Sequence, residues 1–233
     1  MWKEKAYMVA YELSDMLIQL FIANLLWILC NSPLIILGIQ LRLATSIESY
    51  FVLLPLLTLG LPLFFFPTTQ ALFCVMRDSV LQRPSATIKD FFSYLKKNYK
   101  ETLQLGILVT GTLVGLCAAA YYSWFNSLIL FTIVLIALFF LMVMTLQLFS
   151  FQAHFDMPLL WKLNRCRQLV FARPIYSIGA FLLIAVLNYA GTEISIALFI
   201  CIIPAASIFA ATLLFYYQYK RITTKSKVMD YHQ

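Results

Sequence analysis

The chain alternates between long apolar stretches and shorter segments that carry nearly all of its charge. Six stretches contain no Asp, Glu, Lys, Arg or His, namely residues 16–40, 51–75, 102–122, 127–151, 174–189 and 195–216. A bilayer core imposes this pattern, because a helix needs about 20 apolar residues to span it and a central charge costs about 2.5–3.5 kcal/mol. The pattern predicts an all-α, polytopic membrane protein, a six-transmembrane-helix bundle that forms a single membrane domain over residues 1–233.

Composition favours a membrane protein over a soluble one. Hydrophobic residues make up 62% of the chain and charged residues 12%, which is about half the charged share of a typical soluble domain. The five cysteines lie far apart in sequence, and we interpret them as small apolar residues that pack between helices. Motifs for a phosphate-binding loop, a nucleophile elbow or a metalloprotease are absent from the sequence. We therefore expect no enzyme activity, no cofactor and no metal.

Positive charge is unevenly divided between the two sides that six spans would create. Sixteen of the 17 Lys and Arg residues fall in residues 1–15, the linkers 76–101 and 152–173, and the tail 217–233, while only Arg42 falls on the other side. Acidic residues show no such bias, so the asymmetry follows the positive-inside rule. We expect both termini in the cytoplasm. Topology and anionic lipid account for the net charge of +7, so no nucleic acid is expected as a partner.

The loops predicted on the outer side are short. They comprise residues 41–50, 123–126 and 190–194, which is too little chain for a receptor domain. Recognition is therefore expected within the membrane or from the cytoplasm.

The first cytoplasmic linker predicts an amphipathic helix. Thr87 and Asp90 have the spacing of a capping box. Apolar residues follow at helical spacing, with lysines on the opposite face. Such a helix suits the membrane surface or a protein partner. We predict that a partner docks on Phe91, Phe92, Leu95, Tyr99, Lys96 and Lys97.

The second linker predicts a similar helix, capped by Asp156 and with Lys162, Arg165 and Arg167 facing away from the apolar side. The motif Gln-Ala-x-Phe precedes both linkers, at residues 70–73 and 152–155. Together with the shared order of span, basic helix and span, this motif indicates a duplicated hairpin unit. Such units occur in transporters and in membrane scaffolds.

Polar and proline residues within the spans have two interpretations each. The amides of Asn24, Gln147 and Asn188 can join neighbouring helices or contact a solute, and we favour helix contacts. Pro55, Pro62 and Pro67 in the second span and Pro204 in the sixth predict kinks, which serve as fixed bends or line a cavity. Gly111 and Gly115 predict close helix packing, within the bundle rather than in a homodimer. His154 and Asp156 are too few for a metal site.

Three blocks of sequence carry a family resemblance: residues 24–29 running on to Pro33 and Gly38, residues 64–73, and residues 91–100. They resemble the YesL-like family of bacterial integral membrane proteins, over most of the chain. That family has no assigned activity, and its members are typically encoded near genes for oligosaccharide uptake and breakdown. The resemblance implies a bacterial plasma-membrane protein with a sugar-transport component as a candidate partner, and it supplies no catalytic residues.

We therefore expect a non-enzymatic membrane accessory or scaffold protein, auxiliary to carbohydrate uptake or its regulation, whose partners are the lipid bilayer and another membrane protein. The alternative is a small transporter, or transporter subunit, for a neutral solute. An ion-coupled pump is disfavoured, because proton and cation relays use intramembrane Asp, Glu or His and the predicted spans contain none.

Overall fold

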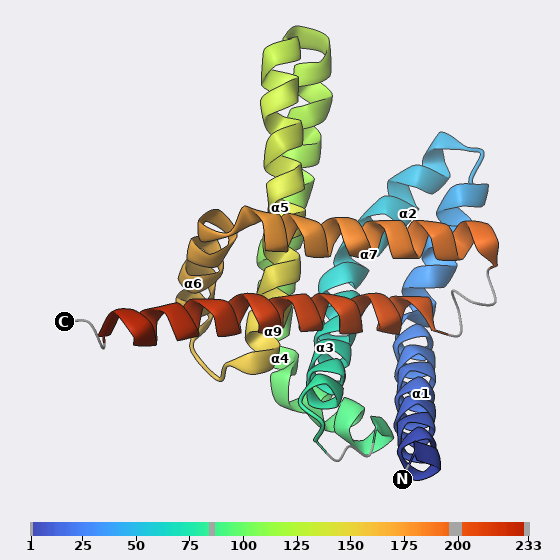
Figure 1. Cartoon of the computed structure of the whole chain (residues 1–233). Coiled ribbons are helices and arrows are strands. Elements are labelled where there is room, and N and C mark those ends of the chain that lie inside the picture. The colour runs from blue at the N-terminus through green and yellow to red at the C-terminus, as the bar shows by residue number, and fades with distance from the viewer. Residues whose placement is uncertain (1, 84–86, 196–201, 231–233) are drawn as a thin grey trace.

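The chain folds into helices joined by short connections. The computed structural model describes residues 2–83, 87–195 and 202–230. Only helices occur in this part, which confirms the all-α class. The elements (Figure 1) are α1 (Trp2–Leu43), α2 (Ile47–Gly60), the π-helical turn η1 (Leu61–Phe65), α3 (Phe66–Val80), α4 (Thr87–Asn126), α5 (Leu128–His154), α6 (Leu159–Ala172), α7 (Pro174–Ile194) and α9 (Ile203–Asp230).

Five helical segments of the described chain are long and apolar enough to cross a membrane. They are Ser14–Leu43, Ile47–Val80, Thr87–Asn126, Leu128–His154 and Pro174–Ile194, and they cover the first five predicted spans apart from residue 127. The sixth span is not confirmed, because residues 196–201 lie outside the described part and α9 begins at Ile203. Pro204 lies in the first turn of α9, where a missing N–H costs little, and the kink predicted there involves preceding residues that lie outside the described part.

The second span passes through a π-helical turn. α2, η1 and α3 follow one another without a break, and η1 begins at Leu61. Pro62 lies in this turn and Pro67 in the first turn of α3. A proline ring excludes the carbonyl four residues earlier and provides no N–H, so the helix widens locally. The predicted break in regular α-helix thus takes the form of a π-helical turn near Pro62 and Pro67, whereas α2 continues through Pro55.

The connections between spans are shorter than predicted. The first linker is not a separate helix, because α4 runs without interruption from Thr87 to Asn126. The outer loop predicted at 123–126 is helical too. Ser127 alone separates α4 from α5, and its hydroxyl accepts a hydrogen bond from the backbone N–H of Leu130 (3.4 Å). A helical backbone satisfies its own polar groups, and this advantage extends helices into chain predicted as loop.

The second linker forms a separate helix, α6, but its charged residues make unpredicted contacts. α6 begins after Pro158 with no side-chain cap, so the prediction that Asp156 caps it was wrong. Asp156 pairs with Lys97 instead. Lys162 was expected to face away from the apolar side, yet it is 1% exposed and binds Glu101. One cation of the predicted polar face therefore points inward.

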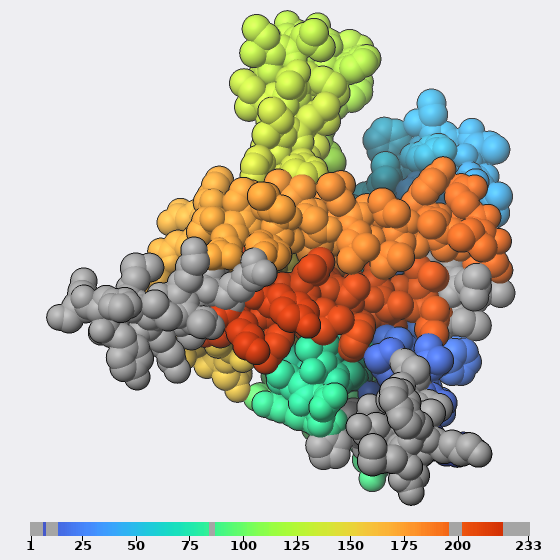
Figure 2. Space-filling view, in the orientation of Figure 1, coloured from blue at the N-terminus to red at the C-terminus, as the bar shows by residue number. Residues whose placement is uncertain are grey.

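The helices do not share a common direction. α4 and α5 form a long antiparallel pair whose tip stands clear of the other elements (Figure 1). α7 packs against α9, and these two helices run across the α4–α5 pair, with α9 also in contact with α1 and α3. Figure 2 shows the result as a tall, narrow α4–α5 projection and a shorter one at α2 above a broad body. Residues 190–194, predicted as an outer loop, belong to α7.

The core is built around α3. Every residue from Phe66 to Met76 is buried. The ring of Phe73 stacks on that of Phe149 of α5, with centroids 5.5 Å apart. Trp27 of α1 donates its indole N–H to Thr69 Oγ1 (3.0 Å). α3 is therefore the element against which α1, α4, α5 and α9 are positioned.

The glycines of α4 have different surroundings. A Cβ on Gly106 would lie 2.8 Å from the Cα of Pro62, so glycine is what allows α4 to approach η1. Around Gly111 and Gly115, no described atom beyond the adjacent residues and the local backbone of α4 lies within 4 Å of such a Cβ. The prediction that these two glycines pack within the bundle was wrong, because the upper part of α4 stands away from it.

Candidate functional site

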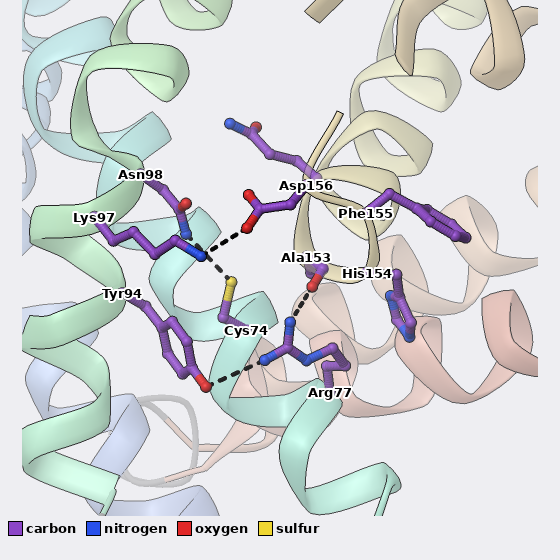
Figure 3. A pocket seen from close by; sticks show the side chains of 10 residues that line it. Cys74, Arg77, Tyr94, Lys97, Asn98, Ala153, His154, Phe155 and Asp156 are labelled. Atoms are coloured by element: carbon purple, nitrogen blue, oxygen red, sulfur yellow. Dashed lines mark hydrogen bonds and ion pairs between the residues drawn. The ribbon is translucent and has the colours of Figure 1, made fainter. Parts of the chain in front are cut away.

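A small polar cavity of about 90 Å³ lies where α3, α4 and the end of α5 meet. α3 contributes Cys74 and Arg77, α4 contributes Tyr94, Lys97 and Asn98, and residues 152–156 form the opposite wall (Figure 3). The second Gln-Ala-x-Phe motif, residues 152–155, lies in the cavity wall, and the first, residues 70–73, directly precedes Cys74, which also lines the cavity. The repeated motif thus marks two helices that meet at one site.

Arg77 and Asp78 form an ion pair beside the cavity. The guanidinium donates to Asp78 Oδ1 from Nε (3.0 Å) and from Nη2 (2.8 Å). Tyr94 donates its hydroxyl proton to Asp78 Oδ2 (2.5 Å) and accepts a hydrogen bond from Arg77 Nη2 (3.2 Å). Arg77 Nη1 also donates to the carbonyl of Ala153. This network joins α3 to α4 and α5, and it satisfies the buried Asp78 carboxylate.

Two further ion pairs join α4 to the segment that follows α5. Lys97 Nζ lies 2.8 Å from Asp156 Oδ2, and the two side chains are 62% and 80% exposed. The hydrogen bond from Lys97 and its charge hold the pKa of Asp156 below its usual value. Four residues further along α4, Glu101 Oε1 accepts from the buried Lys162 Nζ at 2.6 Å. Without Glu101, Lys162 would keep an uncompensated buried charge, so this pair fixes α6 on α4.

Two buried polar atoms in the cavity wall have no hydrogen-bond partner within the described part of the chain. One is Oε1 of Gln152, whose Nε2 donates to Thr102 Oγ1 (3.2 Å). The other is Nε2 of His154, whose ring lies 5.0 Å from that of Phe215 and whose Nδ1 lies 2.9 Å from the carbonyl of Ser150. Buried polar atoms are normally paired, so these two are exceptions.

The chemistry available at the cavity is hydrogen bonding and ion pairing. Among the described residues there is no group of three or more His, Cys, Asp and Glu side chains that could hold a metal ion. Figure 3 shows His154 and Asp156 on different sides of the end of α5. The cations Arg77 and Lys97 approach the cavity from α3 and α4, and each has a carboxylate partner.

The structure divides the predicted docking residues between interior and surface. Phe91 is 0% exposed and belongs to the core, so it is not accessible to a partner. Leu95 is half-buried against the core. The exposed members are Phe92, Tyr99, Lys96 and Lys97. The helical spacing identified an apolar face correctly, but it could not show which edge of that face the rest of the chain covers.

The predicted intramembrane amides mostly connect helices. Asn24 Oδ1 in α1 accepts a hydrogen bond from the backbone N–H of Ala205 (3.1 Å), in the first turn of α9. Asn188 Nδ2 donates to Ser207 Oγ (3.1 Å), which joins α7 to α9. Gln147 is buried, and its Oε1 has no partner among the described residues. Two of the three amides therefore form contacts between helices.

One family model matches part of the chain. Residues 20–121 match the model of a family described as a protein of unknown function, DUF624. No curated protein and no solved structure matches the chain. The matched segment includes Cys74, Arg77 and Lys97, whereas the wall formed by residues 152–156 lies beyond it. The narrower resemblance to the YesL-like family stays a prediction.

The sequence analysis did not identify Arg77, Asp78 or Tyr94 as a network. One signal was available, because Arg77 and Asp78 are the first charged residues after the second charge-free stretch and follow its Gln-Ala-x-Phe motif within five residues. A buried pair at the end of a span has to find its acceptors and donors on neighbouring helices. Tyr94 could not be chosen as the third member, since that contact depends on how α4 packs on α3.

Proposed function

We propose that this chain is a non-enzymatic scaffold or accessory protein of the bacterial plasma membrane, with both termini in the cytoplasm. The observation that carries this proposal is the use of the amides within the spans: Asn24 and Asn188 bind neighbouring helices. The charged residues at the cavity also bind one another. A protein whose polar groups are used in this way is suited to present a fixed surface to another protein.

The surface proposed for docking is the exposed side of the first part of α4. Phe92 is 46% exposed and Tyr99 39% exposed, and Lys96 lies between them in sequence. This combination suits a partner segment that carries both apolar and acidic side chains. Following the resemblance described above, we propose a membrane component of sugar transport as the partner.

Substitution of the exposed aromatic ring tests the docking surface. We expect Phe92→Asp to reduce recovery of the partner from native membranes, because it places a charge where apolar area is buried. Phe171→Asp is the matched control, since Phe171 is an exposed phenylalanine of α6 in the other predicted cytoplasmic linker. Quantitative mass spectrometry after affinity purification measures recovery. Equal recovery with both variants, at equal protein levels, would contradict docking on α4.

Cysteine labelling tests the orientation. Single cysteines replace the exposed Ser93 and Asn126 in a cysteine-free background. Asn126 lies at the end of α4 that is predicted to be external, and Ser123 nearby is buried and unsuitable. We expect an impermeant maleimide to label position 126, but not position 93, in intact cells. The opposite pattern would reverse the proposed topology.

Transport of a neutral solute is the second candidate, and Gln147 is the observation in its favour. Its buried Oε1 is free to accept a hydrogen bond from a solute. If the scaffold proposal is correct, Asn188→Leu lowers stability in detergent and has no separate effect on solute flux into proteoliposomes. Flux by the purified protein that disappears in Gln147→Leu, with folding unchanged, would favour the transporter.

A further inference from the structure

We propose that the cavity bounded by Arg77, Lys97 and Asn98 binds a phosphate group, supplied either by the headgroup of a lipid or by free phosphate. This inference does not depend on the proposed scaffold function. It rests on the donors that converge on the cavity, on the carboxylate that now occupies one of them, and on an acceptor in the cavity wall that has no partner.

Three donors with spare hydrogen-bonding capacity face the cavity. Arg77 uses four of its five N–H groups on described acceptors, which leaves one on Nη1. Lys97 has three N–H groups, and one is used on Asp156. Asn98 Nδ2 has only a long contact to the sulfur of Cys74, at 3.7 Å, as a described partner. A phosphate group offers several strong acceptor oxygens to such a set.

An external anion can displace the Asp156 carboxylate from its ion pair with Lys97. Asp156 lies on the connection between α5 and α6, and its side chain is 80% exposed. Ion pairs between exposed side chains contribute little, so the pair is easily broken. A phosphate group offers more acceptor oxygens than a carboxylate, so it can bind Arg77 and Lys97 together. Release of Asp156 into water leaves its charge solvated.

The wall of the cavity also contains a group that requires a donor. Gln152 is 6% exposed, and its Oε1 has no partner among the described residues. A phosphate monoester near neutral pH often retains one O–H, which can be donated to this oxygen. Sulfate has a similar size and charge but lacks that proton. The site should therefore distinguish phosphate from sulfate.

The position of the cavity is compatible with a lipid headgroup. Arg77 lies just after the predicted end of the second span at residue 75, and residues 152–156 lie just after the predicted end of the fourth span at residue 151. The exposed Lys96 and Lys100 lie on either side of Lys97 and Asn98 in sequence, which adds positive charge nearby. Anionic headgroups gather at this depth of a bilayer.

Ligand-induced stabilisation of the full chain in neutral detergent micelles tests the site. The thermal midpoint is measured with increasing phosphatidic acid, with diacylglycerol as the control that has the same tails and no phosphate, and with inorganic phosphate or sulfate at constant ionic strength. We expect saturable stabilisation only by probes that carry a phosphate group. Stabilisation by inorganic phosphate identifies free phosphate as sufficient, and stabilisation by phosphatidic acid alone identifies a lipid. No saturable effect of either probe, or an equal effect of sulfate, would overturn the proposal.

Three substitutions locate the binding. Lys97→Ala should weaken phosphate binding about tenfold, the loss expected for one charge-assisted hydrogen bond. Asp156→Asn should tighten it about two- to fivefold, because a competing carboxylate is gone. Lys100→Ala removes an exposed lysine of the same helix that does not line the cavity, and it should leave affinity unchanged. Equal weakening by Lys97→Ala and Lys100→Ala would show general surface attraction and would overturn the site.

Discussion

The network around Asp78 should be the most sensitive polar site in the protein. Asp78→Ala removes a carboxylate whose side chain is 6% exposed and which accepts two hydrogen bonds from Arg77 and one from Tyr94. Arg77 is 15% exposed, so its charge would remain mostly buried and would keep only the Ala153 carbonyl and the Tyr94 hydroxyl as acceptors. Loss of one partner of a buried ion pair costs about 3–5 kcal/mol. Because two acceptors remain, we expect about 3 kcal/mol.

Substitution of Arg83, an exposed basic residue near the same carboxylate, provides the control. Arg83 is 60% exposed and lies 3.6 Å from Asp78 Oδ1, so Arg83→Ala should cost at most about 1 kcal/mol. The double variant Arg77→Leu with Asp78→Leu leaves no orphan charge, and it should cost less than the sum of the two single changes. Titration with sodium dodecyl sulfate in mixed micelles, followed by tryptophan fluorescence, gives the free energies. If the free energies of unfolding of Asp78→Ala and Arg83→Ala differ by less than about 1 kcal/mol, the argument from burial is refuted.

Two further predictions use matched positions. Gly106→Ala should destabilise the protein by about 1–3 kcal/mol, because its Cβ would lie 2.8 Å from the backbone of Pro62. Gly111→Ala, in open space, should be neutral or stabilise the protein by up to about 1 kcal/mol. Thermal midpoints in detergent compare the two variants, and equal effects would contradict the close approach. Lys97 lowers the pKa of Asp156 from its ordinary value of 3.8, so the pair stabilises the fold above that pH and its contribution is lost as pH falls through the lowered pKa. The midpoint difference between the wild type and Asp156→Asn should therefore disappear in acid, and a difference that persists would exclude the pair as its cause.

Much of the fold could be predicted because the relevant signals are local. A stretch without charge predicts a long apolar helix from its own residues, and the described structure has such a helix over five of the six stretches. The effect of Pro62 was predictable for the same reason, since the lost N–H and the displaced carbonyl belong to its own helix. Helix ends were less predictable. α4 continues through the loop predicted at residues 123–126, which contains no helix-breaking residue, and only Ser127 separates it from α5.

The site was harder to predict because its contacts join distant parts of the chain. Lys162 looked like a solvated cation in the helical pattern of its own segment, yet it is buried by its contact with Glu101, 61 residues earlier. Phe91 and Phe92 are equivalent in hydrophobicity and adjacent in sequence, and only the packing of α4 on the core makes one buried and the other exposed. Such distinctions arise from the tertiary arrangement.

The crossing of α7 and α9 over the other helices has a consequence for the surrounding lipid. If α4 and α5 stand upright in a bilayer, helices that run across them add cross-sectional area at one depth, while the tip of the α4–α5 pair adds little (Figures 1 and 2). The protein would then displace more lipid from one leaflet than from the other, and it would have the shape of a wedge. We expect a wedge to prefer curved membrane, with its broad side in the leaflet that has the larger area.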